Sequence, residues 1–234
     1  KDIEISNTAS IGDCAFKNCI NLINVKAEKG LAIINDGAFS GCKSLVSIES
    51  LDNVTYIGNG AFEDCVSLTS IEIPNSVKSI SRGTFKNCTS LEEMALPFIG
   101  ESQDSNRYTH LGYIFGASDN WQNINELVPS SLRKIKILDG CTSINSRALE
   151  GCSSITTIEL PSSLTIIEYS AFEGCSGLTS ITIPEKVAEG GGYSWGGNRI
   201  GSAAFKDCSG LTSVTIPEGM RRIGQVTATH NNNR

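Results

Sequence analysis

The sequence predicts an α/β-type solenoid whose right-handed coils stack one parallel β-sheet face, with short helical turns opposite. Three observations carry this prediction. The chain of 234 residues repeats with a period of 23, one part of each repeat alternates apolar and polar residues, and that part ends at Pro in five copies. A fixed period of about 20 to 50 residues is typical of solenoids, propellers and arrays, which bury a core by stacking their repeats.

Each repeat starts at an apolar residue that we call the anchor, and the clearest copy runs from Phe62 to Phe85. The anchors recur along the chain as Phe16, Phe39, Phe62, Phe85, Leu149, Phe172 and Phe205. Three residues after each anchor comes a cysteine, which gives the row Cys19, Cys42, Cys65, Cys88, Cys152, Cys175 and Cys208. Seven copies in one frame make the repeat specific.

The segment L-x-x-I-x-I predicts the strand of each coil, because Leu68, Ile71 and Ile73 place apolar side chains on one face. Pro74 then ends the strand, since proline cannot donate to a β-ladder. Such short strands become stable when successive coils stack them in parallel. The residue before each periodic cysteine is Asn, Asp or Gly, which predicts a left-handed residue closing a single helical turn.

These motifs, L-x-x-I-x-I-P, V-x-x-I and A-F-x-x-C, resemble the BspA-like leucine-rich repeats of bacterial and protist surface proteins. The irregular middle is also similar to the long variant repeat of that family, with LPFIG at 96–100, LGYIFG at 111–116 and VPSSLRKI at 128–135. The resemblance implies a non-catalytic extracellular or cell-surface module for protein interaction or adhesion. Its implied partners are host or neighbouring-cell surface proteins, and it implies no cofactor.

We predict a single leucine-rich-repeat solenoid over residues 1–234, with insertions at about 98–125 and 188–199 and a disordered tail at about 225–234. After the first insertion, the frame puts the fifth anchor at Glu126, so that this coil lacks its Phe and Cys. Ile3 and Ile5 look like the end of an earlier strand, and we expect a processed or truncated piece. We expect no membrane span, because no apolar run approaches about 18 residues, and no signal peptide.

The net charge of −6 and the absence of a Lys/Arg run argue against a nucleic-acid partner. We predict that the periodic cysteines are buried free thiols, because parallel side chains on stacked coils do not face one another as a disulfide requires. No C-x-x-C spacing is present, so a zinc site is not expected. Burial is also predicted for the off-frame Cys14 and Cys141, with higher reactivity as the alternative.

Ligand contact is predicted at the insertions and the adjoining sheet surface. The insertions carry the aromatic candidates Tyr108, Trp121, Tyr193 and Trp195, because inserted segments of repeat proteins often form the binding face. Outward strand positions carry the charged candidates Glu49, Glu72, Lys134 and Lys136. The plainer alternatives are that the aromatic side chains pack on their own coils and that the charged face is simply solvated.

No catalytic motif of the H-E-x-x-H, G-x-S-x-G or Walker type occurs. We therefore predict no enzyme, no catalytic residue and no metal ligand, since a regular sheet face offers carboxylates such as Glu49 and Glu72 no pocket. The alternative function is a carbohydrate-binding or enzyme-accessory module, in which the loop aromatics stack on sugar rings.

Overall fold

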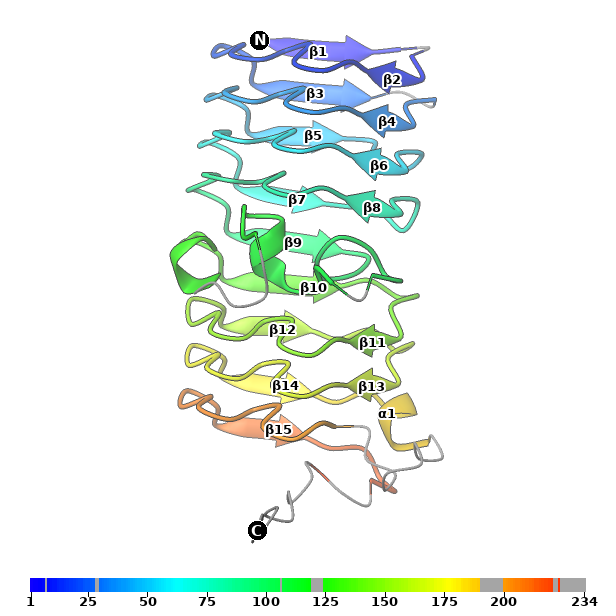
Figure 1. Ribbon diagram of the computed structural model, residues 1–234, viewed down its shortest axis with the longest axis vertical. Helices are drawn as coiled ribbons and strands as arrows, with labels where there is room; N and C mark the ends of the chain where they lie inside the picture. The colour runs from blue at the N-terminus through cyan, green and yellow to red at the C-terminus, as the bar shows by residue number, and fades with distance from the viewer. Residues whose placement is uncertain are drawn as a thin grey trace, which may run out of the picture.

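The computed structural model describes residues 1–6, 8–27, 30–105, 107–118, 124–189, 200–220 and 223. Short parallel strands follow one another along one side of an elongated stack of coils (Figure 1). They are β1 (Asp2–Ile5), β3 (Asn24–Ala27), β5 (Ser47–Glu49), β7 (Ser70–Glu72), β9 (Glu93–Leu96), β10 (Lys134–Ile137), β12 (Thr157–Glu159), β14 (Ser180–Thr182) and β15 (Ser213–Thr215). The predicted parallel-strand solenoid is confirmed.

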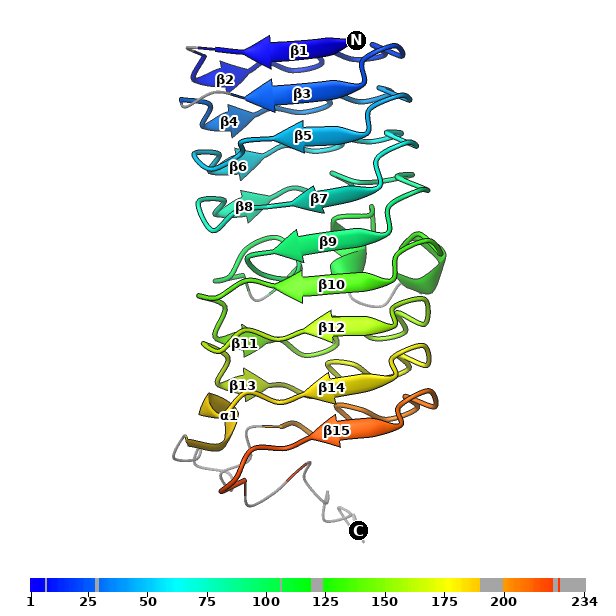
Figure 2. The ribbon, with the colours of Figure 1, turned by 180° about the vertical axis from the view of Figure 1, so that it is seen from behind.

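The hydrogen-bonded ladder on this side is divided into two sheets. One has the order β1-β3-β5 and the other the order β15-β14-β12-β10-β9-β7. Equivalent positions of the repeat face each other, as in the pairs Val25–Ile48 and Met94–Ile135. The two sheets lie end to end on the same side of the stack (Figure 2), so the strand face continues past the break between β5 and β7.

A second, narrower ladder runs along the return side of the coils. It is built from two-residue strands: β2 (Ser10–Ile11), β4 (Ile33–Ile34), β6 (Tyr56–Ile57), β8 (Ser79–Ile80), β11 (Ser143–Ile144) and β13 (Ile166–Ile167). These strands pair in parallel with the equivalent residues of the next coil. The second residue of each strand is buried and the first points outward, so V-x-x-I ends in a strand that the sequence did not predict.

The helical turns expected around residues 61–65 are replaced by a chain of tight turns. Phe62 donates its N–H to the Thr84 carbonyl of the next coil (2.9 Å), while Cys65 donates its N–H to Phe62 in its own coil (3.2 Å). Alternate N–H groups therefore serve the neighbouring coil and are not free for an α-helix, which needs consecutive bonds within the segment. Helix is sparse among the described residues and occurs in or beside the insertions: η1 (Leu111–Tyr113), η2 (Ile124–Glu126) and α1 (Lys186–Glu189).

The predicted left-handed residues before the periodic cysteines are all present. Their φ angles lie between 58° and 75°, at Asn18, Gly41, Asp64, Asn87, Gly151, Gly174 and Asp207. Asn18, Gly41, Asp64, Gly151 and Gly174 direct their N–H groups to the following coil, as Asp64 does to the Lys86 carbonyl at 2.9 Å. Asn, Asp and Gly tolerate this backbone conformation better than other residues do.

The anchors form a continuous stack through the core. The rings of Phe39 and Phe62 are 5.5 Å apart and nearly parallel at 8°, and those of Phe62 and Phe85 are also 5.5 Å apart, at 13°. All three side chains are fully buried. Stacked repeats of this kind depend on contacts with their nearest neighbours, so each interior ring is held from both sides.

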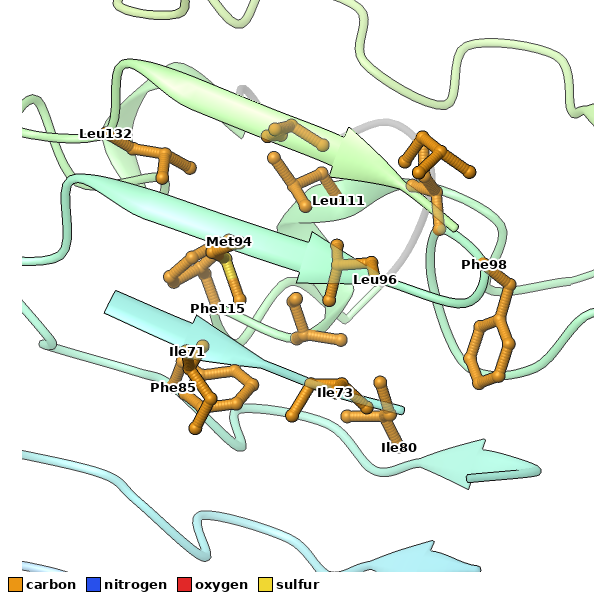
Figure 3. Packing of buried hydrophobic residues seen from close by; sticks show 14 of the residues in the cluster. Ile71, Ile73, Ile80, Phe85, Met94, Leu96, Phe98, Leu111, Phe115 and Leu132 are labelled. Atoms are coloured by element: carbon orange, nitrogen blue, oxygen red, sulfur yellow. The ribbon is translucent and has the colours of Figure 1, made fainter. Parts of the chain in front are cut away.

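The assignment of the fifth anchor to Glu126 is wrong, because Phe115 takes that place. The Phe115 ring packs 6.5 Å from Phe85, tilted by 51°, and Phe85 donates its N–H to the Ile114 carbonyl. Figure 3 shows Phe115 in the core next to Phe85 and Met94, whereas Glu126 is exposed. The extra residues of this region therefore fall both before and after the anchor Phe115. A count that assumes the constant spacing of the other coils misses this division.

The cysteine row supplies hydrogen bonds between coils. Cys65 donates its S–H to the Phe39 carbonyl (3.3 Å), and the same carbonyl accepts the N–H of Cys42 (3.1 Å). Cys88 repeats this bond to the Phe62 carbonyl at 3.1 Å. Burial raises the pKa of Cys42 to about 11 and that of Cys88 to about 12, so both are neutral thiols near pH 7.

All nine cysteines are free, as predicted, but two of them are not buried. Cys19 is exposed, and so is Cys14 of the same coil, for which burial was expected. Cys141 is buried, with its S–H donated to the Ser143 carbonyl (3.3 Å).

The first prediction concerns the anchor stack. Phe62→Ala should lower the free energy of unfolding by about 3–5 kcal/mol, because the ring is fully buried between two others and its removal leaves a cavity. Phe16→Ala is the matched control, because Phe16 is only half-buried, and it should lower the free energy of unfolding by less. Urea unfolding followed by circular dichroism measures both, and equal losses would contradict the stack.

The second prediction concerns thiol reactivity. Cys14 and Cys19 should react first with iodoacetamide at pH 8, because the attacking species is the thiolate and burial suppresses it elsewhere in the row. Peptide mass spectrometry after a short exposure should find the interior cysteines unmodified until the protein is denatured. Interior thiols that label as fast as Cys14 would show that the row is open to solvent.

Candidate functional site

The outer face of the main strands is a continuous polar surface. Glu49, Glu72 and Lys136 are exposed on it, and Lys134 is half-buried. Lys136 lies in register with Ala95 on one side and with Glu159 on the other, so the equivalent positions form a row across the strands. The structure therefore brings the four charged sequence candidates onto one face.

Lys134 makes the shortest ion pair on this face. Its ammonium lies 2.7 Å from the carboxylate of Glu159, one coil further on, and this hydrogen bond raises the Lys134 pKa above its usual value. The two side chains are 37% and 45% exposed, so solvent screens the attraction and its contribution to folding is small. The pair instead fixes where positive charge sits on the face.

A hollow of about 590 Å³ opens on the outer face between β12 and β14. These strands pair in register only at Thr157 and Ser180, whereas β14 and β15 keep three pairs. The strands separate toward their carboxyl ends, and Ile158 and Ile181 line the space between them. Two core side chains thus line a hollow that opens to the surface.

The lining of the hollow combines an apolar floor with a polar rim. Leu160 and Pro184 extend the apolar surface, while Thr182, Ser162 and Lys186 bring polar groups to the edge. Lys186 opens the short helix α1, which borders the hollow. The volume lies in the range of about 300–1,000 Å³ that is typical of ligand and side-chain pockets.

The aromatic candidate Tyr108 lies away from this face. Its ring stacks on Tyr113 at 4.7 Å, and its carbonyl accepts the N–H of Glu101, whose own carbonyl accepts the Ile80 N–H beside the second ladder. Figure 2 has the strands β9 and β10 in front and this segment behind them. Tyr113 and Phe115 are buried, in agreement with the alternative that these aromatics pack on their own coils.

The other aromatic candidates, Trp121, Tyr193 and Trp195, lie outside the described residues. Within the described ranges, no group of three His, Cys, Asp or Glu side chains converges as a metal site would require. None of the described helices combines the length and apolar character needed to span a membrane.

The family comparison agrees with the repeat frame. The family described as the BspA type leucine rich repeat region matches residues 2–110 and 127–232, with six copies. The chain belongs to the BspA-type leucine-rich repeat proteins. The unmatched stretch between these ranges holds η1 and Phe115, where the structure departs from the regular coil.

Several bacterial leucine-rich repeat proteins are among the solved structures that match this chain. The Treponema pallidum leucine-rich repeat protein TpLRR aligns with a TM-score of 0.52 and 22% identity over 76% of this chain and 77% of its own. A Bacteroides ovatus leucine-rich repeat protein aligns with a TM-score of 0.30 and 21% identity, over 95% of this chain and 82% of its own. A leucine rich cell surface protein of Faecalibacterium prausnitzii aligns with a TM-score of 0.34 and 22% identity, over 94% of this chain and 88% of its own. Among curated proteins, none matches the sequence.

The hollow was not predicted from the sequence. Both strands that form it keep the repeat pattern, with Ile155, Ile158 and Leu160 in one and Leu178, Ile181 and Ile183 in the other. Nothing in that alternation distinguishes a separating pair of strands from a tightly paired one, because the pattern reports which side chains face inward and not how far apart the coils lie.

The third prediction tests the separation of β12 and β14. Backbone amides near the carboxyl ends of these strands should exchange with deuterium faster than those of β9 and β10, which keep four pairs in register. Hydrogen exchange followed by mass spectrometry measures this difference, since amides without a stable ladder partner open more readily. Equal protection of the two strand pairs would contradict the description of the hollow.

Proposed function

We propose that this chain is a non-catalytic protein-interaction module that acts at the cell surface or outside the cell and adheres to surface proteins of a host or neighbouring cell. Family membership supports the interaction role, because leucine-rich repeat proteins typically bind other proteins. A long stack of coils also presents an extended surface with room for many small contacts.

The proposed binding position rests on one observation, which is the hollow between β12 and β14 with its apolar floor and polar rim. Protein interfaces concentrate their binding energy where a large side chain fills a desolvated pocket surrounded by polar contacts. We infer that an apolar or aromatic side chain of the partner enters this hollow. Lys136, Glu72 and Glu49 lie on the same face, and in the proposal they set the orientation of the partner.

The test starts from a screen of surface and secreted proteins, with a glycan array measured on the same sample. Thr182→Trp should then weaken binding of a captured protein by about tenfold or more, because the new ring occupies the hollow. Thr215→Trp is the matched control, since Thr215 faces Thr182 in register but does not line the hollow.

Equal affinities of the two variants would move the interaction away from the hollow. Binding to glycans with no protein captured would replace the proposed function by the carbohydrate-binding alternative. The melting temperatures of both variants check that they are folded. Little change is expected, because Thr182 and Thr215 are both exposed.

A further inference from the structure

A second concave site lies at the corners of the coils, the turns that follow the main strands. It is a recess of about 470 Å³ between the corner after β7 and the corner after β10. Asn75, Phe98 and Asp139 hold the same place after their strands, because each comes two residues after the strand's last inward side chain, which is Ile73, Leu96 or Ile137. The recess therefore occupies one position of the repeat in three successive coils.

The recess forms because the middle corner is drawn inward. Asn75 donates its side-chain N–H to the Asp139 carbonyl (3.0 Å), although the two residues are 64 apart in sequence and two coils apart in the stack. Stacked coils are spaced by about 4.8 Å, so corners two coils apart meet only when the one between them is withdrawn. Phe98, which belongs to that corner, is 4% exposed.

A regular corner looks different. Ser162 follows Asp139 by one coil, and its hydroxyl donates directly to the Asp139 carboxylate at 2.9 Å. The recess thus lies where the irregular coil interrupts the stack. Gln103, from the extra segment, closes it with a hydrogen bond to the Gly140 carbonyl (3.1 Å). Figure 3 shows Phe98 beyond the end of β9, to one side of the core residues Met94 and Leu96.

Hydrogen-bond acceptors dominate the lining. The amide N–H groups of Asn75 and Gln103 are donated to backbone carbonyls, which leaves their amide oxygens as acceptors. Asp104 and Asp139 add two carboxylates, and the hydroxyl of Ser162 lowers the Asp139 pKa and keeps it ionised near neutral pH. The positive group of the lining is Lys78, which already donates to the Asn75 carbonyl.

The apolar side of the recess narrows the choice of ligand. Pro97, Phe98 and Val77 form it, and they offer a surface for a hydrocarbon stem. A divalent cation does not fit, because within the described residues no three carboxylate, His or Cys groups converge. The acceptor-rich rim favours a positively charged group with several hydrogen-bond donors. The apolar side favours a group that stands at the end of a hydrocarbon stem.

We propose that the recess binds an arginine side chain of the protein partner, with its methylene stem over Pro97 and Phe98 and its guanidinium between Asp104 and Asp139. The guanidinium offers five N–H donors in a plane and is permanently charged, which suits a mixed rim of carboxylate and amide oxygens. This inference rests on the proposed function, because it requires that the partner is a protein. It adds a second point of contact, at the edge of the outer face.

The positive charge of Lys78 repels the guanidinium, so the proposal predicts variants that strengthen binding of arginine as well as variants that weaken it. The Lys78 ammonium lies in the lining and repels the ligand, so Lys78→Gln should strengthen binding of arginine while Asp104→Asn should weaken it. A merely structural role for these exposed side chains would not produce opposite changes. The isolated side chain should bind weakly, because few of the contacts of a whole partner are present.

The experiment titrates the full chain with Nα-acetyl-arginine N-methylamide, followed by NMR of the Asn75 and Gln103 side-chain amides. We expect saturable shifts of these signals, about fivefold weaker binding for Asp104→Asn and tighter binding for Lys78→Gln. Asp52→Asn is the control for the loss of one surface carboxylate, because Asp52 occupies in a regular coil the corner position that Asp139 occupies here, and it should leave the affinity unchanged.

The neutral analogue with citrulline in place of arginine should not shift these signals. Equal binding of the two compounds, equal effects of the Asp104 and Asp52 variants, or shifts confined to other residues would overturn the proposal. These outcomes would leave the proposed function standing, because capture of a protein through the hollow is measured separately by the Thr182 and Thr215 variants.

Discussion

The structure depends on backbone hydrogen bonds that pass from one coil to the next in the turn segments as well as in the strands. Phe62 and Asp64 both donate their N–H groups to the following coil, and Glu63 between them donates within its own turn, to the Gly60 carbonyl. This alternation holds equivalent residues of successive coils at nearly constant distance. The anchor rings, the cysteine row and the left-handed residues all repeat because each coil is bonded to the next in the same way.

The sequence contained enough information for the stack but not for its turns. The alternation of Ile71 and Ile73 with polar residues predicted the main strands, and the Asn, Asp and Gly residues predicted the left-handed positions. The spacing of Ala61, Phe62 and Cys65 fits a turn of helix and a chain of tight turns equally well, because both bring residues three apart to one side. Hydrogen bonds to another coil decided between them, and these are not visible in a local pattern.

The irregular coil limited the prediction of the site. Counting back from the strand at Lys134 led to Glu126, whereas the chain uses Phe115 as its anchor and places extra residues on both sides of it. The charged candidates on the outer face were placed correctly because strand alternation is regular. The hollow and the recess are departures from the average coil, one by separation of strands and one by withdrawal of a corner, and a repeat frame describes only the average.

The cysteine row has a consequence for redox chemistry. Stability resides in stacked side chains and backbone bonds, so assembly of the coils requires no oxidative pairing step and no disulfide catalyst. Oxidants attack thiolates, and packing keeps the interior sulfur atoms protonated. Oxidative damage should therefore start at the exposed thiols of Cys14 and Cys19 and reach the buried thiols only when the coils around them open.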